Sequence, residues 1–425
     1  MSLIRQNSAY DVLKIRDYRF YIIARTFITF GVNVLATVVG WQVYEYTQDS
    51  FSLGLIGLAE FIPFLIVTLI GGYIADIFDR KKIIQTCVFL YTICAFMLFL
   101  LTTQYKIIID MYGVLPIYGI ISLTGLVRGF LGPAQQAFAA QLVPKELLTN
   151  AATWSTMSWH LASIGGPAIG GILYGVSKSA WSSYALVSAL AFIGFLFFLS
   201  IKSRHSVRNT DGTSRNSREG VEKQEGFFDS VNVGMDFVFK NQMIWGSLAL
   251  DMFAVLFGGA VALLPAFAKD VLQLGPEGLG MLRAAPAVGA LVMASYLAYN
   301  PPTQNAGKNL LYAVAGFGVC TILFALSRNF WFSAAMLAGT GFFDNYSMII
   351  RGTIIQLFTP NEMRGRVSAV NSLFIGSSNE LGAFESGLAA KLMGLVPSVM
   401  FGGTMTLIVV LTTWIKAPKL RSLNL

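Results

Sequence analysis

Charged side chains isolated within long apolar stretches are the residues of this sequence best placed to do chemistry. On insertion scales, a charged residue at the centre of a bilayer costs roughly 2.5–3.5 kcal/mol, so each one that is retained needs a structural or functional reason. Acids and arginines in such positions can bind a polar substrate or carry a coupling proton. We predict these roles for the following residues: Arg25, Glu60, Arg128, Asp251, Arg283, Asp344 and Glu380.

For four of these residues a structural alternative stays open, because buried ion pairs between helices would retain the same charges without any contact to a substrate. The four are Arg25, Glu60, Asp251 and Arg283. Asp251 is the best single candidate for a proton-coupling acid. Glu385 is too far along the helix from Glu380 to share one narrow face with it, so at most one of the two is expected to line a cavity. His160 is more typical of a packing histidine.

The composition indicates which elements must position these side chains. Hydrophobic residues make up 55% of the 425 residues, charged residues make up 12%, and the mean hydropathy is +0.63. Soluble globular proteins carry roughly 25% charged residues, so this chain has too little charge to cover a surface in water. Its high apolar content and three cysteines also exclude disordered, collagen-like and disulfide-scaffold classes. A polytopic membrane protein remains.

Twelve apolar segments are long enough to cross a membrane, since a spanning helix needs about 20 mostly apolar residues. They lie near Tyr21–Tyr46, Leu53–Ile77, Ile83–Thr103, Met111–Phe138, Ala151–Gly175, Ser183–Ile201, Ile244–Phe267, Gly278–Tyr299, Asn309–Ser327, Phe330–Leu357, Val367–Leu392 and Pro397–Ile415. A polar stretch rich in Ser, Asn, Arg and Glu follows the sixth segment. We therefore expect an N-terminal six-helix bundle with a short leader helix (1–201), a cytoplasmic linker (202–240) and a C-terminal six-helix bundle (241–425).

Basic residues set the predicted orientation. Most of the 30 lysines and arginines fall in segments on one side of the predicted spans, and the positive-inside rule assigns that side to the cytoplasm. Arg351 is counted in this cytoplasmic set. Both termini are then cytoplasmic. Membrane topology accounts for the net charge of +8, so nucleic acid is not expected as a partner.

Internal repeats relate the two halves. LVPKELLTNAATW after the fourth span resembles LFTPNEMRGRVSAV after the tenth, and GLAEFIP near the second span resembles GMLRAAP near the eighth. The first match also aligns Gly171 with Gly387 and Arg128 with Asp344. Parallel six-helix repeats are typical of transporters that rock one half against the other. The third, sixth, ninth and twelfth spans contain no charged residue, so we expect them to face lipid while the others surround a polar central cavity.

The segment GGYIADIFDRKKI (71–83), between the second and third spans, resembles the cytoplasmic G-x-L-A-D-R-x-G-R-K signature of the major facilitator superfamily. Its matching residues are Gly72, Asp76, Arg80 and Lys81. Asp79 stands where the family has a glycine at a tight turn. The resemblance implies that Asp76 and Arg80 belong to a cytoplasmic charge cluster that stabilises the outward-facing state. The basic residues would also serve as an ordinary positive-inside anchor.

A second motif, GPAIGG (166–171) on the fifth span, resembles the G-x-x-x-G-P-x-x-G-G signature of many exporters in this superfamily, with Ala162 at the first glycine position. Its matching residues are Gly166, Pro167, Gly170 and Gly171. Small residues four positions apart let another helix pack closely, and Pro167 removes one backbone hydrogen bond. Ordinary helix packing is the alternative to an exporter-specific role.

Longer stretches, such as LGPAQQAFAAQLVPKELLTNAATW and GLGMLRAAPAVGAL, are similar to the branch that contains the enterobactin exporter and macrolide-type efflux proteins. The resemblance implies an all-α major facilitator fold in the bacterial inner membrane and proton-coupled export of a siderophore or amphipathic drug. A small-molecule substrate and membrane lipid are the expected partners, and a monomer is the expected state. No cofactor is expected, because the proton gradient would supply the energy.

Three alternatives stay open at this point. The same fold could import a lysophospholipid, a siderophore or another small solute, or the chain could be a membrane enzyme such as an acyltransferase, or a sensor that transports nothing. The sequence contains no P-loop, no Cys/His cluster with metal-ligand spacing and no catalytic constellation at a membrane surface. We therefore expect neither an enzyme nor a metal site.

Overall fold

The computed structural model describes residues 10–202, 227–300, 304–360 and 363–423, apart from the side chains of residues 68–77, 106 and 227–232. Every regular element within these residues is a helix. In chain order they are η1 (Asp11–Lys14), α1 (Arg16–Thr47), α2 (Ser50–Ile77), α3 (Arg80–Thr103), α4 (Lys106–Tyr112), α5 (Leu115–Leu142), η2 (Lys145–Leu147), α6 (Leu148–Ser177), α7 (Trp181–Ser200), α8 (Phe227–Lys240), α9 (Gln242–Phe257), η3 (Ala260–Leu263), α10 (Leu264–Ala266), η4 (Phe267–Val271), α11 (Pro276–Tyr299), α12 (Ala306–Leu326), α13 (Phe330–Phe358), α14 (Arg364–Met393), α15 (Leu395–Lys416) and α16 (Pro418–Arg421).

The long helices follow the predicted spans except at two places. The fourth span was predicted to begin at Met111, but α4 ends at Tyr112 and α5 begins at Leu115. Gly113 between them has a φ of 62°, a left-handed conformation that glycine adopts readily and that ends an α-helix.

The seventh predicted span, Ile244–Phe267, falls within a segment long and apolar enough to cross a membrane, Gln242–Val271, but it is not one continuous helix. α9 ends at Phe257, and the chain continues through the short elements η3, α10 and η4. The break falls at Gly258 and Gly259, where α14 passes close by. A Cβ added to Gly259 would lie 2.7 Å from the carbonyl oxygen of Gly382 on α14, so this close approach needs a residue without a side chain.

Nine helical segments of the described residues are long and apolar enough to cross a membrane. They are α1, residues 50–67 of α2, α3, α5, α7, the segment from α9 to η4, α11, α12 and α15. The remaining long helices, α6, α13 and α14, have 29 or 30 residues each but carry more polar side chains. The predicted count of twelve spans and the cytoplasmic position of the termini stay predictions.

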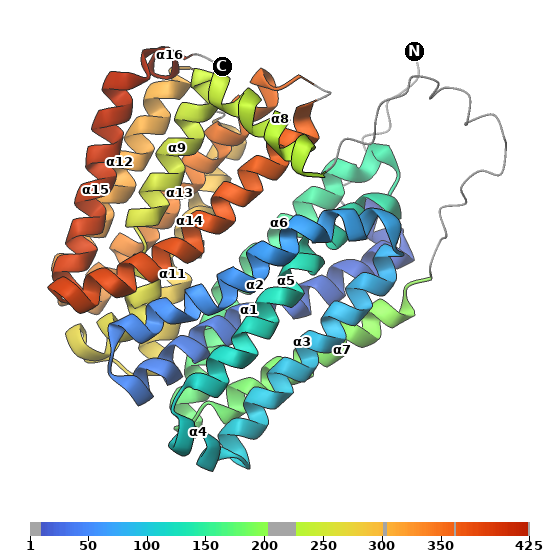
Figure 1. Ribbon diagram of the computed structural model, residues 1–425, viewed down its shortest axis with the longest axis vertical. Coiled ribbons are helices and arrows are strands. Elements are labelled where there is room, and N and C mark those ends of the chain that lie inside the picture. The colour runs from blue at the N-terminus through green and yellow to red at the C-terminus, as the bar shows by residue number, and fades with distance from the viewer. Residues whose placement is uncertain (1–9, 203–226, 301–303, 361–362, 424–425) are drawn as a thin grey trace.

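Figure 1 shows the long helices in two groups, one formed by α1 to α7 and the other by α9 to α15. Between them in the sequence, α8 (Phe227–Lys240) occupies the last part of the stretch predicted to be a linker, and it packs against α14 and α9. Residues 203–226 lie outside the described residues. The predicted linker therefore contains at least one ordered helix.

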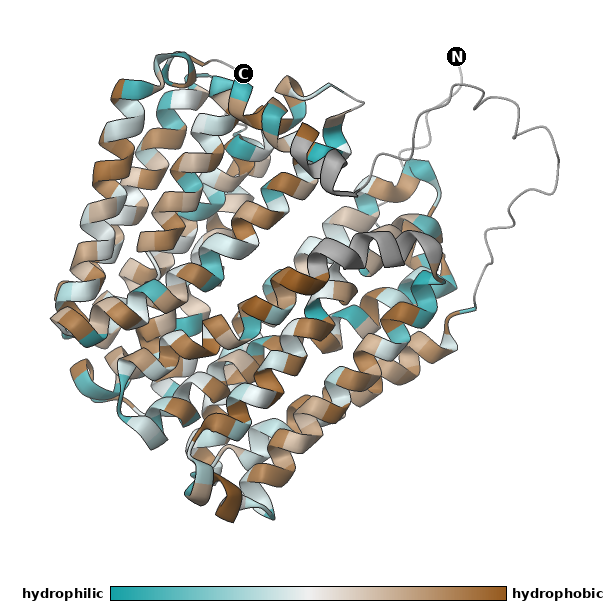
Figure 2. Ribbon diagram, in the orientation of Figure 1, coloured by the Kyte–Doolittle hydropathy of each residue, from teal (hydrophilic) through white to brown (hydrophobic). Residues whose placement is uncertain are grey.

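The helices without charged residues in their apolar stretches lie at the edges of the two groups. α3 packs against α7, and α12 packs against α15. Each of the four exposes large apolar side chains, among them Phe89, Phe96, Phe192, Leu196, Val319, Leu323, Phe401 and Ile408. Figure 2 shows long helices that are hydrophobic along most of their length, with hydrophilic residues gathered toward their ends. Such an outer surface suits contact with lipid.

The two groups cross at two points where glycines face each other. Between α6 and α11, a Cβ added to Gly171 would lie 3.0 Å from the Cα of Gly280, and between α2 and α14, a Cβ added to Gly387 would lie 2.7 Å from the Cα of Gly54. Helix backbones therefore pack directly on each other at both crossings. The repeats align Gly171 with Gly387, and Gly280 with a glycine one turn from Gly54, so the crossings are two copies of one contact.

Further contacts between the groups lie at the same ends of these helices. Tyr44 on α1 donates a hydrogen bond to Asp270 on η4. The rings of Phe51 on α2 and Phe384 on α14 have centroids 5.9 Å apart, and the Nζ of Lys391 lies 4.7 Å from the Phe51 ring centroid. In the predicted topology this is the outer end of the molecule. The two groups are joined here, and in Figure 1 they diverge toward α8.

A valine at the α6–α11 crossing tests this joint. Gly171→Val would force the two helices apart, and overpacking of this kind costs about 1–3 kcal/mol. Ala266 is fully buried beside Tyr44 and Leu53, where the groups meet. We expect a cysteine placed there to react with a membrane-impermeant thiol reagent roughly fivefold faster, or more, in the Gly171→Val background. The native cysteines are buried, which keeps background labelling low.

The matched control is Gly119→Val on α5, because a Cβ added to Gly119 meets nothing within 4 Å. Labelling at the same rate in both valine variants would show that the glycine crossing does not keep this end of the molecule closed.

Candidate functional site

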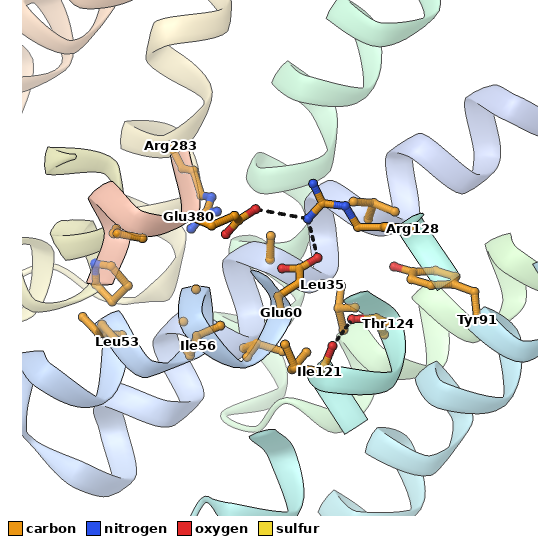
Figure 3. Close-up of a pocket in the computed structure, with 18 residues that line it drawn as sticks. Leu35, Leu53, Ile56, Glu60, Tyr91, Ile121, Thr124, Arg128, Arg283 and Glu380 are labelled. Carbon is orange, nitrogen blue, oxygen red and sulfur yellow. Dashed lines mark hydrogen bonds and ion pairs between the residues drawn. The ribbon is translucent and has the colours of Figure 1, made fainter. Parts of the chain in front are cut away.

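Charged side chains from three helices meet at the centre of the molecule. Arg128 on α5 forms an ion pair with Glu60 on α2 through Nη1, and the same nitrogen lies 3.4 Å from the Oε1 atom of Glu380 on α14. Figure 3 shows both contacts. The Arg128 guanidinium also lies 5.6 Å from the ring centroid of Phe64, a distance at which a cation and an aromatic face attract each other. Since Glu380 comes from the C-terminal group, Arg128 connects the two groups.

Glycines bring the three helices close enough for these contacts. A Cβ added to Gly57 on α2 would lie 2.9 Å from the Cβ of Ala383 on α14, and one added to Gly125 on α5 would collide with the backbone carbonyl of Glu60. Each glycine precedes a charged residue of its own helix by three positions, and residues so spaced share one face. The faces that allow close packing therefore also carry Glu60 and Arg128 into the centre.

The cluster lines a cavity of about 210 Å³, to which Tyr91 and Thr124 add further polar groups. Arg283 on α11 reaches the cavity from the C-terminal group, and Figure 3 shows its guanidinium beside Glu380. Among the described residues, Arg283 makes no hydrogen bond and no ion pair. It is a cation open to a ligand, whereas Arg128 is already engaged by an acid.

A second cavity, of about 340 Å³, adjoins the first within the C-terminal group. The two cavities share Ala262, Arg283 and Ala383, so Arg283 lies at their junction. Thr340 and Asp344 on α13 add polar groups to the wall of the second cavity. Small-molecule pockets typically measure about 300–1,000 Å³, so the adjoining cavities have room for a small organic ligand.

Asp251 belongs to a separate site. It forms an ion pair with Arg351 on α13, and the two side chains are only 10% and 6% exposed. The prediction that Arg351 is cytoplasmic is therefore wrong. α13 continues to Phe358, two turns beyond Arg351, and the buried carboxylate of Asp251 on the neighbouring helix is stabilised by a buried base. The position of Arg351 inside the predicted span Phe330–Leu357 was the sequence signal for this burial.

Other sequence-predicted residues lie away from the two cavities. Arg25 lies on α1 beside Tyr21, about two turns before the first cavity-lining residue of that helix, Val32. Glu385 accepts a hydrogen bond from the Ser386 hydroxyl at 3.5 Å and lines neither cavity, unlike Glu380. His160 is buried, with its ring 5.1 Å from that of Trp159. Within the predicted set, the structure brings together Glu60, Arg128, Arg283, Asp344 and Glu380.

The cytoplasmic signature lies at the connection between α2 and α3. Gly72 and Asp76 are in the last turns of α2, where side chains lie outside the described residues, and Arg80 is the first residue of α3. Asp79 accepts a hydrogen bond from the Lys81 backbone N–H at 2.9 Å and caps α3. An aspartate cap thus permits the two-residue turn for which the family has a glycine. The Nζ of Lys81 donates to the carbonyl oxygen of Ile201 at 2.6 Å.

The glycines of the exporter-like motif pack α6 against two helices at once. Added Cβ atoms on Gly166 and Gly170 would meet Asn33 and Val34 of α1, in the same group, whereas Gly171 faces Gly280 of α11, in the other group. The helix continues unbroken through Pro167. The motif therefore fixes the distance between α6 and its own group and also forms one of the crossings between the groups.

The described residues contain no group of three or more His, Cys, Asp or Glu side chains that could hold a metal ion. Cys87, Cys94 and Cys320 are free and buried. The chemistry that the site offers is ionic and hydrogen-bonding: two acids and two arginines face the first cavity, and one acid faces the second.

A family model described as a transmembrane secretion effector matches residues 7–425. Among curated proteins, the chain is similar to the enterobactin exporters of Shigella dysenteriae serotype 1 and Escherichia coli O1:K1. Each is 24% identical over 401 residues, which cover 92% of this chain and 89% of the exporter.

Solved structures with very different sequences share the fold. A D-xylose–proton symporter superimposes with a TM-score of 0.71 at 13% identity, covering 96% of this chain and 99% of the symporter. An inward-facing bacterial homologue of the iron transporter ferroportin gives a TM-score of 0.67 at 16% identity, covering 96% of this chain and 99% of that protein.

The two ion pairs are expected to differ in their effect on stability. Asp251→Asn leaves Arg351 as a buried charge without an acid, and breaking a buried pair costs about 3–5 kcal/mol. Glu60→Gln leaves Arg128 with Glu380, and the Arg128 side chain is 41% exposed to the cavity. We therefore expect Asp251→Asn to lower the thermal unfolding midpoint of the purified protein in detergent clearly more than Glu60→Gln. Equal midpoints would contradict this difference between the pairs.

Proposed function

Because the chain belongs to the transmembrane secretion effector family of the major facilitator superfamily, we propose that it exports a small organic molecule from the cytoplasm by proton-coupled alternating access. Family membership and the apolar helices make it a multi-pass protein of the bacterial inner membrane. It is a transporter of a small-molecule substrate rather than an enzyme. Export, its coupling to protons and the identity of the cargo are the proposal.

The observation that carries the proposal is the charged cavity between two halves that are joined at one end. Glu60, Arg128, Arg283 and Glu380 line this cavity from both halves. The contacts between the halves gather at the predicted outer end. A cavity closed at that end would take up cargo from the cytoplasm, and rocking of the halves about the crossings would then expose it to the other side.

The relatives support export and a polar cargo. Proteins 24% identical to this chain are enterobactin exporters, so a siderophore is our first proposal for the cargo and an amphipathic drug is the second. Arg283 would bind a polar or anionic group of the cargo, since it lines the cavity and makes no hydrogen bond or ion pair with the described residues. One chain supplies the whole cavity, so we propose that it works as a monomer in lipid and that the proton gradient, rather than a cofactor, drives it.

Glu380 is the acid in this cavity whose ionic contact is weaker. Arg128 holds Glu60 more closely than Glu380, whose Oε1 is 3.4 Å from Nη1. As a carboxylate, Glu380 would accept hydrogen bonds from cargo hydroxyl or amine groups. A proton arriving on Glu380 neutralises the carboxylate and makes it a weaker acceptor while the Glu60–Arg128 pair persists, so proton and cargo would compete for one residue. Competition of this kind produces antiport.

Comparison of a deletion strain with its complemented parent identifies the cargo. The compound that disappears from the medium and accumulates in cells lacking the gene is then tested in inside-out membrane vesicles. We expect a proton gradient, acidic inside, to drive its uptake into these vesicles. Proton-driven uptake into right-side-out vesicles instead would show an importer or symporter of the same fold, and no transport in either direction would favour a sensor.

The coupling role of Glu380 is tested with the same vesicles. We expect Glu380→Gln to reduce gradient-driven transport at least tenfold, because glutamine retains the shape of the side chain but exchanges no proton. Glu385→Gln is the matched control on the same helix, outside both cavities, and should transport at the rate of the native protein. Wild-type transport by Glu380→Gln would remove Glu380 from the mechanism.

A further inference from the structure

A small space lies between the Asp251 site and the central cavities. It measures about 10 Å³ and is bounded by polar groups of Asp251 on α9 and of Asp344 and Ser347 on α13, with apolar side chains around them. A cavity needs about 10–15 Å³ of this measure to hold one water molecule. The space is therefore of the size of a single water, and carboxyl groups bound it from two helices.

An unpartnered polar atom faces this space. The Ser347 hydroxyl, which lines the space, is buried and has no hydrogen-bond partner among the described residues. Buried polar atoms in native proteins are nearly always hydrogen-bonded, and an ordered water is a common partner for those that lack a protein group. A water between Asp251, Asp344 and Ser347 would satisfy the Ser347 hydroxyl and touch both acids.

The small space adjoins the 340 Å³ cavity, since Val255, Phe317 and Asp344 line both. Asp344 borders both this space and the 340 Å³ cavity, which meets the first cavity at Arg283. Thr340, Asp344, Ser347 and Arg351 follow one another on α13 at alternating spacings of four, three and four residues, so they lie along one face of the helix. This face leads from the wall of the second cavity to the buried Asp251–Arg351 pair.

The charges around Asp344 leave its carboxyl group without an ionic partner. Among the described residues it makes no ion pair and no hydrogen bond, while Asp251 is held by Arg351. The helices packed against α13 are α9, α11 and α12. α9 contributes Asp251, α11 contributes Arg283 across the cavity and Glu277 at its far end, and α12 contributes only Lys308 in its first turn.

The other helices around Asp251 do not supply a second ionic partner among the described residues. Their charges lie near the helix ends, on the central cavity or beside Ser386: Asp236, Lys240, Arg364, Arg366, Glu380, Glu385, Lys391, Lys416, Lys419 and Arg421. Arg351 is thus the group whose charge responds most directly to a proton on Asp251.

We propose that this space holds a water molecule that passes protons between Asp344, at the wall of the second cavity, and Asp251, in its ion pair with Arg351. Asp344 gives its proton to the water as the water gives another to Asp251, so one O–H bond forms for each that breaks and the water is regenerated. Neutral Asp251 then releases Arg351. The proposal deepens the proton coupling proposed above, and it places a second proton site away from the cargo.

The distance of the Asp251 site from the cargo cavity has a consequence for how the helices move. α9 and α13 are held together at this site by the buried ion pair, and α9 ends nearby at Phe257, where the chain is interrupted before η3. Protonation of Asp251 would weaken the contact between α9 and α13 without any change in the cargo cavity. A proton taken from the second cavity can in this way alter helix packing in the C-terminal half.

Infrared difference spectra of the purified protein in lipid nanodiscs, recorded without cargo between acidic and neutral buffer, test the water-bridged acids. We expect a protonated-carboxyl band that Asp344→Asn abolishes and that Ser347→Ala shifts, since the serine hydroxyl helps to hold the bridging water. Ser378→Ala is the matched control, because Ser378 is equally buried but donates to its own helix at Ile375. It should leave the band in place.

Two results would overturn the proposal. One is a Ser347→Ala spectrum that matches those of the native protein and Ser378→Ala. The other is a band that responds to sodium at constant pH, which would show a metal cation between the oxygen atoms instead of a water. The Arg351 charge beside Asp251 disfavours a cation there, so we expect no sodium response.

A transport measurement separates this proposal from the proposed function. We expect Ser347→Ala to slow gradient-driven transport several-fold while leaving cargo exchange without a gradient at the native rate, because exchange needs no net proton movement. The infrared result does not depend on cargo or on export. If the shift in the band is observed but transport proves independent of protons, the water site stands and the proposed coupling falls. If the shift is missing but export is still driven by protons, the water site falls and the proposed coupling stands.

Discussion

The ionic contacts of the Arg128 guanidinium with Glu60 and Glu380 are the interactions on which the rest of the structure depends. It holds Glu60 from its own half and lies close to Glu380 from the other half, within a cavity formed by both. Two carboxylates and a cation are stable in a membrane only if they are close together and shielded from lipid. Gly57 and Gly125 provide that proximity by removing side chains where α2, α5 and α14 meet. Apolar helices such as α3 and α12 complete the arrangement by facing outward.

The C-terminal half contains a second, drier polar site. Asp251 and Arg351 are almost fully buried, whereas the Arg128 side chain is open to the cavity. The difference suits different roles, because an open ion pair can exchange partners with a bound molecule while a buried one responds mainly to the loss of a charge. Asp344 stands between the two sites, at the wall of the second cavity. α13 thus connects the region where cargo is proposed to bind with the packing of α9.

The helices could be predicted from the sequence because the thickness of the bilayer sets the length of an apolar segment. The position of charged residues within apolar segments also predicted which of them would lie at the centre, including Glu60, Arg128 and Glu380. It did not predict which charges pair, since pairing depends on how each helix is rotated and where it crosses its neighbours. Arg351 was counted with the cytoplasmic basic residues, because the sequence does not show its pairing with Asp251.

The break in the helix between α9 and η3 was not predicted either, because it depends on contacts between distant parts of the chain. The break at Gly258 and Gly259 follows from the close passage of α14, a contact between distant parts of the chain that leaves no signal in local hydropathy. The small-residue motif on α6 did indicate close packing. That Gly166 would face α1 and Gly171 would face α11 was visible only once the helices were placed in space.

The paired glycine crossings bear on how this architecture could arise and move. If the two halves descend from one duplicated ancestor, the α6–α11 and α2–α14 contacts are the same joint inherited twice, and together they define a line about which the halves can roll. At these glycine contacts the helix backbones pack directly on each other, so no interdigitated side chains need to separate each time the halves move. The energy that changes during a cycle would then reside in the ionic contacts, which a proton or a bound molecule is able to alter.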